Sequence, residues 1–185
     1  MLRNQSGFSL VETLVAIGLL TTAIVASAQL LAVATTANLS ARHSTYAAIL
    51  AAQKIEQLQS LTWGTDTGGA AVSDLTADTV ASPEMAAGGS GLTLSPPDAL
   101  RRNAAGYVDY VDRVGQPLGG GAIAPSAAAY TRRWSITALP TNPANTLVIQ
   151  VLVTPRRDRS AADIAGVSQL PDEARLVTLR TRKGP

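Results

Sequence analysis

The chain has 185 residues, of which 46% are hydrophobic and only 4% aromatic, and its formal net charge is +2. This length suits one domain with a short appended segment, and so few aromatic side chains predict a modest core. The absence of cysteine excludes a disulfide framework and a thiolate metal site. With His43 as the single histidine, expected at a solvated or interface position, we predict no enzyme, no metal and no cofactor.

The first feature along the chain is a long apolar segment with one carboxylate at its start. From Thr13 to Ala41 there are 29 residues without a formal charge, which as a helix would measure about 44 Å. A bilayer core is about 30 Å thick, so the segment is long enough to span a membrane. Glu12 stands at its head, where a lone carboxylate in hydrocarbon costs on the order of 3 kcal/mol and should find a cationic partner.

Two conventional interpretations leave Glu12 unexplained. A secretory signal peptide is supported by Arg3 and by the cleavage pattern Ala26-Ser27-Ala28, and it predicts a mature N-terminus at Gln29. The apolar run nevertheless continues past that cleavage point. A plain transmembrane anchor over 13–37 satisfies the positive-inside rule through Arg3, but it gives Glu12 no role.

A third interpretation starts from the sequence FSLVETLVAIGLL, which follows the short polar leader MLRNQSG. This junction resembles the type IV prepilin signature. The resemblance implies that a membrane peptidase removes residues 1–7 by cutting between Gly7 and Phe8, and that Phe8 is then N-methylated. It also implies that Glu12 sets axial register during assembly, by pairing with the N-terminal ammonium of its own chain or of Phe8 in a neighbouring subunit.

An amphipathic pattern follows the apolar run. Its apolar residues fall within one half of a helical wheel, and polar residues take the other half, with Ile49 as the exception. We therefore expect one helix from about Ser9 to Leu61, with a membrane-spanning and assembly half over 8–37 and an amphipathic half over 38–62. The apolar face comprises Leu39, Tyr46, Ala47, Leu50, Ala51, Ile55, Leu58 and Leu61.

The remainder of the chain divides into a loop region and a sheet. Residues 63–106 are rich in Gly, Ala and Asp and predict a loop, and Gly119–Gly121 predict another. Over 107–185 the hydrophobic period is two, which predicts an antiparallel β-sheet. TLVIQVLVT is apolar on both faces and should be a central strand, whereas the basic ARLVTLRTR should be an edge strand. The expected fold is α+β, a long N-terminal helix packed on a small antiparallel sheet.

Charged residues of the sheet region give weaker signals. Asp109 and Asp112 precede Gly115, but two carboxylates are thin support for a calcium shell of six to eight oxygens. Arginine pairs could contact DNA, yet scattered pairs of this kind are expected at an ordinary surface. The pairs are Arg101-Arg102, Arg132-Arg133 and Arg156-Arg157.

Residues 1–63, and more loosely 107–182, are similar to V-type minor pilins. This resemblance implies a minor structural subunit of a type IV pilus that is incorporated into the fibre or primes it. A type II secretion pseudopilin is the alternative within this class, and an exported binding protein or adhesin with a conventional signal peptide is the alternative outside it.

The same resemblance implies the location and the partners. The precursor would cross the bacterial inner membrane once, with a cytoplasmic N-terminus and a periplasmic C-terminal domain, before it enters the fibre. The implied partners are the prepilin peptidase, other minor and major pilins, inner-membrane lipid and the pilus assembly platform. No small-molecule substrate is expected, and nucleic acid is not an expected partner.

Overall fold

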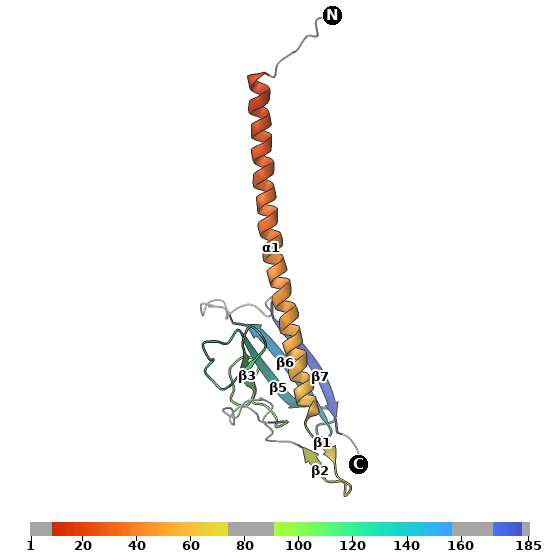
Figure 1. The fold of residues 1–185 in the computed structure, drawn as a ribbon. Helices are drawn as coiled ribbons and strands as arrows, with labels where there is room; N and C mark the ends of the chain where they lie inside the picture. The colour runs from red at the N-terminus through yellow and green to blue at the C-terminus, as the bar shows by residue number, and fades with distance from the viewer. Residues whose placement is uncertain (1–8, 74–90, 157–171, 183–185) are drawn as a thin grey trace, which may run out of the picture. The chain divides into compact units, whose positions relative to one another are not determined.

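The structure is a computed structural model that describes residues 9–73, 91–156 and 172–182. These residues form one long helix, α1 (Leu10–Ser60), and seven strands (Figure 1). The chain divides into two compact units, Met1–Ala41 and Arg42–Pro185, so α1 contributes to both. The expected α+β fold, with a long N-terminal helix and a small antiparallel sheet, is confirmed.

Helix α1 begins at Leu10 because Ser9 caps its first turn. The Ser9 Oγ accepts a hydrogen bond from the Glu12 N–H at 3.2 Å, which satisfies one of the otherwise unpaired amides of the first turn. Glu12 lies in that turn, where a carboxylate interacts favourably with the positive end of the helix dipole. The 51 residues of α1 contain no proline, and Gly18 is their only glycine, so no residue forces a break.

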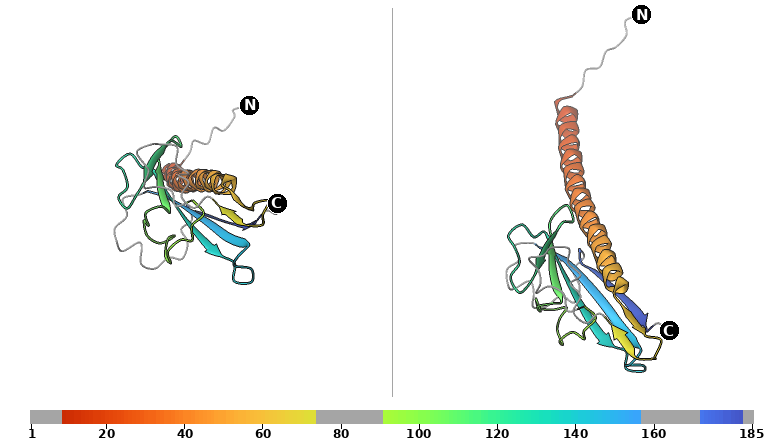
Figure 2. Two further views of the ribbon diagram at one scale, coloured as in Figure 1. Left: turned by 90° about the horizontal axis from the view of Figure 1, so that it is seen from below. Right: turned by 60° about the horizontal axis from the view of Figure 1, so that its bottom comes forward.

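The second unit is built on a five-stranded antiparallel sheet of order β4-β3-β5-β6-β7 (Figure 2). As predicted, the two-sided apolar strand is interior, because β6 lies between β5 and β7, and the basic strand β7 lies at an edge. The strands are β3 (Val108–Val111), β4 (Pro117–Gly120), β5 (Tyr130–Ala138), β6 (Thr146–Pro155) and β7 (Ala174–Thr181).

The core lies between one face of this sheet and the part of α1 that belongs to the second unit. Leu50 and Leu58 of α1 are buried in the same cluster as Trp134, Ile136 and the inward-facing residues of β6. The predicted exception, Ile49, is 49% exposed. Burial of one helical stripe against one sheet face is the usual way in which such a two-layer domain forms its core.

Strand β7 also fixes the end of α1. The last turn of the helix contains no basic residue of its own, but Arg180 of β7 donates hydrogen bonds to the carbonyl oxygens of Leu58 and Leu61. A cation near the last carbonyls satisfies acceptors that the helix leaves unpaired and complements its dipole. Two residues later, the guanidinium of Arg182 lies 3.7 Å from the ring centroid of Trp63.

Two predicted loops contain strands. Gly119–Gly121 were expected to form a loop, but Gly119 and Gly120 pair with β3, and the register shifts between Tyr110 and Val111. The positive φ of Gly119, 117°, lets the chain follow this irregular register.

The second exception lies in the predicted loop over 63–106, where β1 (Trp63–Thr65) and β2 (Ala71–Ser73) form a separate hairpin. The Asp66 Oδ1 accepts the backbone N–H groups of Gly68 and Ala70, at 3.0 and 2.7 Å. A turn held in this way by an aspartate side chain brings two short strands together without a long hydrophobic pattern in the sequence. Residues 74–90 of the predicted loop lie outside the described residues.

Candidate functional site

The apolar side chains of the first unit are exposed. Leu10, Leu19 and Leu30 are 81%, 68% and 71% exposed, respectively. Helix α1 is long and apolar enough to cross a membrane, and none of its most apolar stretch is buried within the described residues. An exposed apolar surface of this extent requires lipid or other protein to cover it.

The hydroxyl groups of this unit from Thr13 to Thr36 form their hydrogen bonds within the helix. Thr21 donates to the Gly18 carbonyl oxygen at 2.9 Å, and Thr22 donates to the carbonyl oxygens of Leu19 and Gly18 at 2.9 and 3.1 Å. Ser27 donates to the Ala23 carbonyl oxygen at 2.8 Å. Thr13, Thr35 and Thr36 donate in the same way to carbonyls three or four residues earlier. Hydroxyls bonded internally can enter hydrocarbon without the cost of an unsatisfied polar group.

Of the predicted site residues, only Glu12 lies within the described part of this helix. Gly7 and Phe8 are outside the described residues, whereas Glu12 is exposed and lies one turn after the capping Ser9. Within the part of the chain that the structure describes, no side chain pairs with the Glu12 carboxylate.

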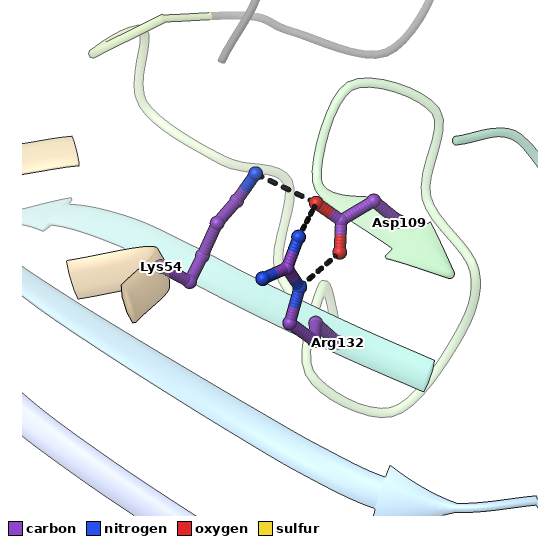
Figure 3. A network of polar contacts seen from close by, with 3 residues as sticks. All are labelled: Lys54, Asp109 and Arg132. Atoms are coloured by element: carbon purple, nitrogen blue, oxygen red, sulfur yellow. Dashed lines mark hydrogen bonds and ion pairs between the residues drawn. The ribbon is translucent and has the colours of Figure 1, made fainter. Parts of the chain in front are cut away.

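The second unit contains a buried charge cluster that the sequence interpretation missed (Figure 3). Lys54 of α1, Asp109 of β3 and Arg132 of β5 meet on the sheet face that packs against the helix. The Lys54 Nζ lies 2.8 Å from the Asp109 Oδ2, and Arg132 donates from Nε and Nη2 to the two carboxylate oxygens at 2.7 and 2.8 Å. Lys54 also lies 3.9 Å from the ring centroid of Trp134.

Electrostatics keeps this cluster ionised. Burial alone would raise the pKa of Asp109, but the adjacent Lys54 and Arg132 cations and their hydrogen bonds together hold the pKa below its ordinary value of 3.8. Because the exposed fractions of Lys54 and Asp109 are both 0%, loss of Asp109 would leave the Lys54 and Arg132 cations in the core without a counter-charge. The cluster joins one helix to two strands, which indicates a structural role.

This cluster corrects two expectations from the sequence. Arg132 was expected at the surface, but it is only 4% exposed, and Asp109, considered as a calcium ligand in a turn, is a fully buried residue of β3. The overlooked signal was Lys54, which is at the centre of the predicted apolar face, among Leu50, Ala51 and Leu58. A cation there requires a buried anion, and Asp109 stands between apolar neighbours in an otherwise apolar strand.

His43 lies at an internal interface, one of the two positions expected for it. Its Nδ1 is 3.1 Å from the Tyr130 Oη, and Tyr46 packs on the Tyr130 ring with centroids 5.3 Å apart. Burial raises the pKa of Tyr130, so its hydroxyl stays neutral at physiological pH. The described residues contain no group of three or more His, Cys, Asp or Glu side chains that could hold a metal ion.

Comparison with known proteins identifies the start of the chain. Residues 2–28 match the family model described as the prokaryotic N-terminal methylation motif. Neither the curated proteins nor the solved structures gave a match to the chain. The matched span contains Gly7, Phe8 and Glu12, and it confirms the resemblance to type IV pilin-like prepilins that the sequence indicated.

Proposed function

We propose that this chain, which carries the N-terminal methylation motif of type IV pilin-like prepilins, is a minor structural subunit of a type IV pilus. The observation that supports this most is the coincidence of the motif over 2–28 with an exposed apolar helix whose first turn contains Glu12. In this proposal the prepilin peptidase cuts between Gly7 and Phe8, and Phe8 is methylated on its new amine. The subunit then enters the fibre with other minor and major pilins.

The proposed role of Glu12 follows from its surroundings. It is the one formally charged residue between Leu10 and Ala41, on a helix whose other side chains there are uncharged and exposed. Cleavage after Gly7 would create an ammonium group at Phe8, four residues from Glu12. When the subunit is drawn from lipid into a bundle of similar helices, pairing with such an ammonium would remove the cost of an unpaired carboxylate and fix axial position.

The location follows from the same proposal. The precursor would sit in the inner membrane through the first half of α1, with its N-terminus cytoplasmic and its sheet domain periplasmic, in contact with lipid and the pilus assembly platform. The second unit would then offer a further surface for contacts with neighbouring subunits in the fibre.

Mass spectrometry of the mature N-terminus tests this proposal. We expect a chain that begins with N-methyl-Phe8. A chain that begins at Gln29 would instead establish a conventional signal peptide, and an intact Met1 would establish a plain anchor. Either of these two results would overturn the proposal.

A second test concerns assembly. Glu12→Gln keeps the size of the side chain and removes its charge, so cleavage should continue while incorporation into fibres falls. Ser27→Ala provides a control, because it removes a polar group from the same helix and leaves Glu12 in place, so incorporation should continue. Normal incorporation of Glu12→Gln would contradict the role in register.

Loss of twitching rather than of secretion on deletion of the chain would separate a pilus subunit from a type II secretion pseudopilin.

A further inference from the structure

The edge strand β7 is long and regularly paired. It pairs with β6 through eight consecutive residues, from Ala174 to Thr181, without a register shift. Within the described residues it is the last strand of the sheet, with no strand bonded to its other side (Figure 1). An open strand of this length offers a row of backbone donors and acceptors to another chain.

The direction of those backbone groups can be worked out from one hydrogen bond. The Arg182 N–H donates to the Asn145 carbonyl oxygen, so Arg182 directs its backbone groups toward β6. In an antiparallel ladder this direction alternates from residue to residue. Leu176, Thr178 and Arg180 therefore point their backbone groups toward β6, whereas Val177 and Leu179 point theirs outward from the sheet.

The side chains of the outward-pointing residues are apolar and exposed. Val177 and Leu179 are 58% and 59% exposed, on the sheet face opposite α1. Edge strands are usually protected from other chains by a charge, a proline or a bulge. The centre of β7, residues 176–179, has none of these, and its charges flank that centre at Arg175 and Arg180.

The other edge is protected. β4 has only four residues, begins with Pro117 and contains two glycines, and its pairing with β3 is irregular. A proline lacks a backbone donor, and a bulge twists an edge away from a straight partner. The two edges of the sheet therefore differ, and β7 is the edge suited to binding.

Topology restricts which partner can bind β7. Two copies joined by antiparallel β7 strands would be related by a two-fold axis perpendicular to those strands. The second-unit part of α1 runs in about the same direction as β7 (Figures 1 and 2), so this axis would turn the two helices in opposite directions. Chains inserted in one membrane with a common orientation cannot pair in this way.

A parallel arrangement keeps the helices in the same direction. The direction of the chain alternates along the five strands of the sheet, so its two edge strands, β4 and β7, run in the same direction. A second copy placed by translation would therefore bring its β4 beside the β7 of the first copy. The protected edge β4 is a poor partner. The partner must therefore be a different subunit of like fold with a straighter edge strand.

We propose that the free edge of β7, centred on Val177 and Leu179, binds an edge strand of a second, non-identical pilin-like subunit in parallel orientation. The inference rests on the proposed function for the common orientation of the two chains. The partner strand would pair with the outward backbone groups of Val177 and Leu179 and place apolar side chains beside theirs. A carboxylate on the partner near Arg175 would complement the charge there.

Photo-crosslinking of the full chain in cells tests this proposal. The variant Leu179→p-benzoylphenylalanine carries the probe on the edge, and Ile123→p-benzoylphenylalanine is its control, because Ile123 is 87% exposed but lies in the loop after β4. We expect Leu179 to crosslink to an edge strand of another chain that carries a prepilin signal. Adding Val177→Pro, which removes one outward N–H, should reduce this product to the level of the Ile123 control, whereas Val177→Thr should retain it.

The proposal is overturned if Leu179 crosslinks only to copies of the same chain or to no pilin-like chain. It is also overturned if the product survives Val177→Pro or forms equally from Ile123. Thermal unfolding of Val177→Pro checks that the domain still folds, and Val177→Lys offers a second disruption of the edge that leaves the probe at position 179 in place. If the N-terminus of the same sample is N-methyl-Phe8 but the crosslink is absent, the edge proposal alone fails. If the N-terminus is not processed after Gly7, the proposed function itself fails.

Hydrogen exchange gives an independent measurement on the unassembled full chain in detergent. The amides of Val177 and Leu179 should exchange faster than those of Leu176 and Thr178, which are bonded to β6. Equal protection of all four amides would contradict the assignment of outward-pointing groups.

Discussion

The two units of the chain handle polar groups in opposite ways. In the first unit, the Ser and Thr hydroxyls from Thr13 to Thr36 bond to carbonyls of their own helix, and Glu12 is the only formal charge between Leu10 and Ala41. In the second unit, a lysine, an aspartate and an arginine from three separate elements meet in a dry core. Helix α1 is common to both, but its side chains in the first unit are exposed, whereas in the second unit Leu50 and Leu58 pack in the core.

This difference implies two sources of stability. The second unit buries its apolar side chains against its own sheet and should unfold cooperatively as a domain. The first unit buries none of its large apolar side chains within the described residues, so lipid or neighbouring helices must supply its packing. Substitutions can separate the two sources, because each should affect one unit and spare the other.

The largest effect is expected from Asp109→Asn. It leaves Lys54 and Arg132 buried without a counter-charge, so the free energy of unfolding should fall by about 3–5 kcal/mol in chemical denaturation. Lys54→Met is the matched control, because it leaves the bidentate pair of Asp109 and Arg132 intact and electrically neutral. We expect a clearly smaller loss from Lys54→Met, and equal losses would contradict this account of the cluster.

A pair of leucines on the same helix compares the two units directly. Leu50 is 1% exposed, and Leu50→Ala should lower the free energy of unfolding of the domain by about 2–5 kcal/mol. Leu19 is 68% exposed, and Leu19→Ala should change the same quantity by less than about 0.5 kcal/mol. A large effect of Leu19→Ala in detergent would show that the first unit contributes to folding of the second.

A smaller loss of unfolding free energy is expected from a substitution in the turn between β3 and β4. Gly115 has a φ of 90°, and a Cβ there would lie 2.9 Å from the Tyr46 Oη. Gly115→Ala should cost about 1–3 kcal/mol of unfolding free energy. Gly69→Ala is the control for backbone strain alone, because φ is 81° but no atom lies within 4 Å. An equal cost at both glycines would exclude a steric contribution from Tyr46.

The mildest perturbation is a change of pH. The pKa of Asp109 is lower in the folded state than its ordinary value of 3.8, so its contribution to stability is present above about pH 4 and is lost as pH falls through the lower folded value. Only part of this contribution disappears at pH 3, which makes the change small. We would measure the free energy of unfolding from pH 7 to pH 3 for both chains. Below pH 4 it should fall less for Asp109→Asn than for the unaltered chain.

The fold was largely predictable because it follows from hydrophobic period. The 3.6-residue pattern around Leu50 and Leu58 predicted the buried stripe of α1, and the two-residue pattern of TLVIQVLVT predicted an interior strand. The β1–β2 hairpin was not predictable from period, because each strand has three residues and the turn depends on one aspartate side chain. Gly119 and Gly120 were predicted to lie in a loop because of the glycine-rich composition there, but pairing with β3 makes them part of a strand.

The site was predictable only in part, for a different physical reason. Glu12 is conspicuous because it interrupts an uncharged run, and a local motif is sufficient to find it. The Lys54–Asp109–Arg132 cluster joins residues 55 and 23 positions apart, so no local pattern contains it. Lys54 on an apolar stripe signals that an anion is needed, but the choice of Asp109 depends on how β3 and β5 pair.

The internal hydrogen bonds of the first unit have a mechanical consequence. Because the hydroxyls from Thr13 to Thr36 are already bonded to their own carbonyls, they offer little to hold a neighbouring helix at one height. The packing energy between apolar helices that share no hydrogen bonds changes little when one helix slides along the other. In the proposed fibre, a bundle of these helices would therefore lengthen or twist at low cost along most of the span, and the proposed pairing of Glu12 would be the contact that resists sliding.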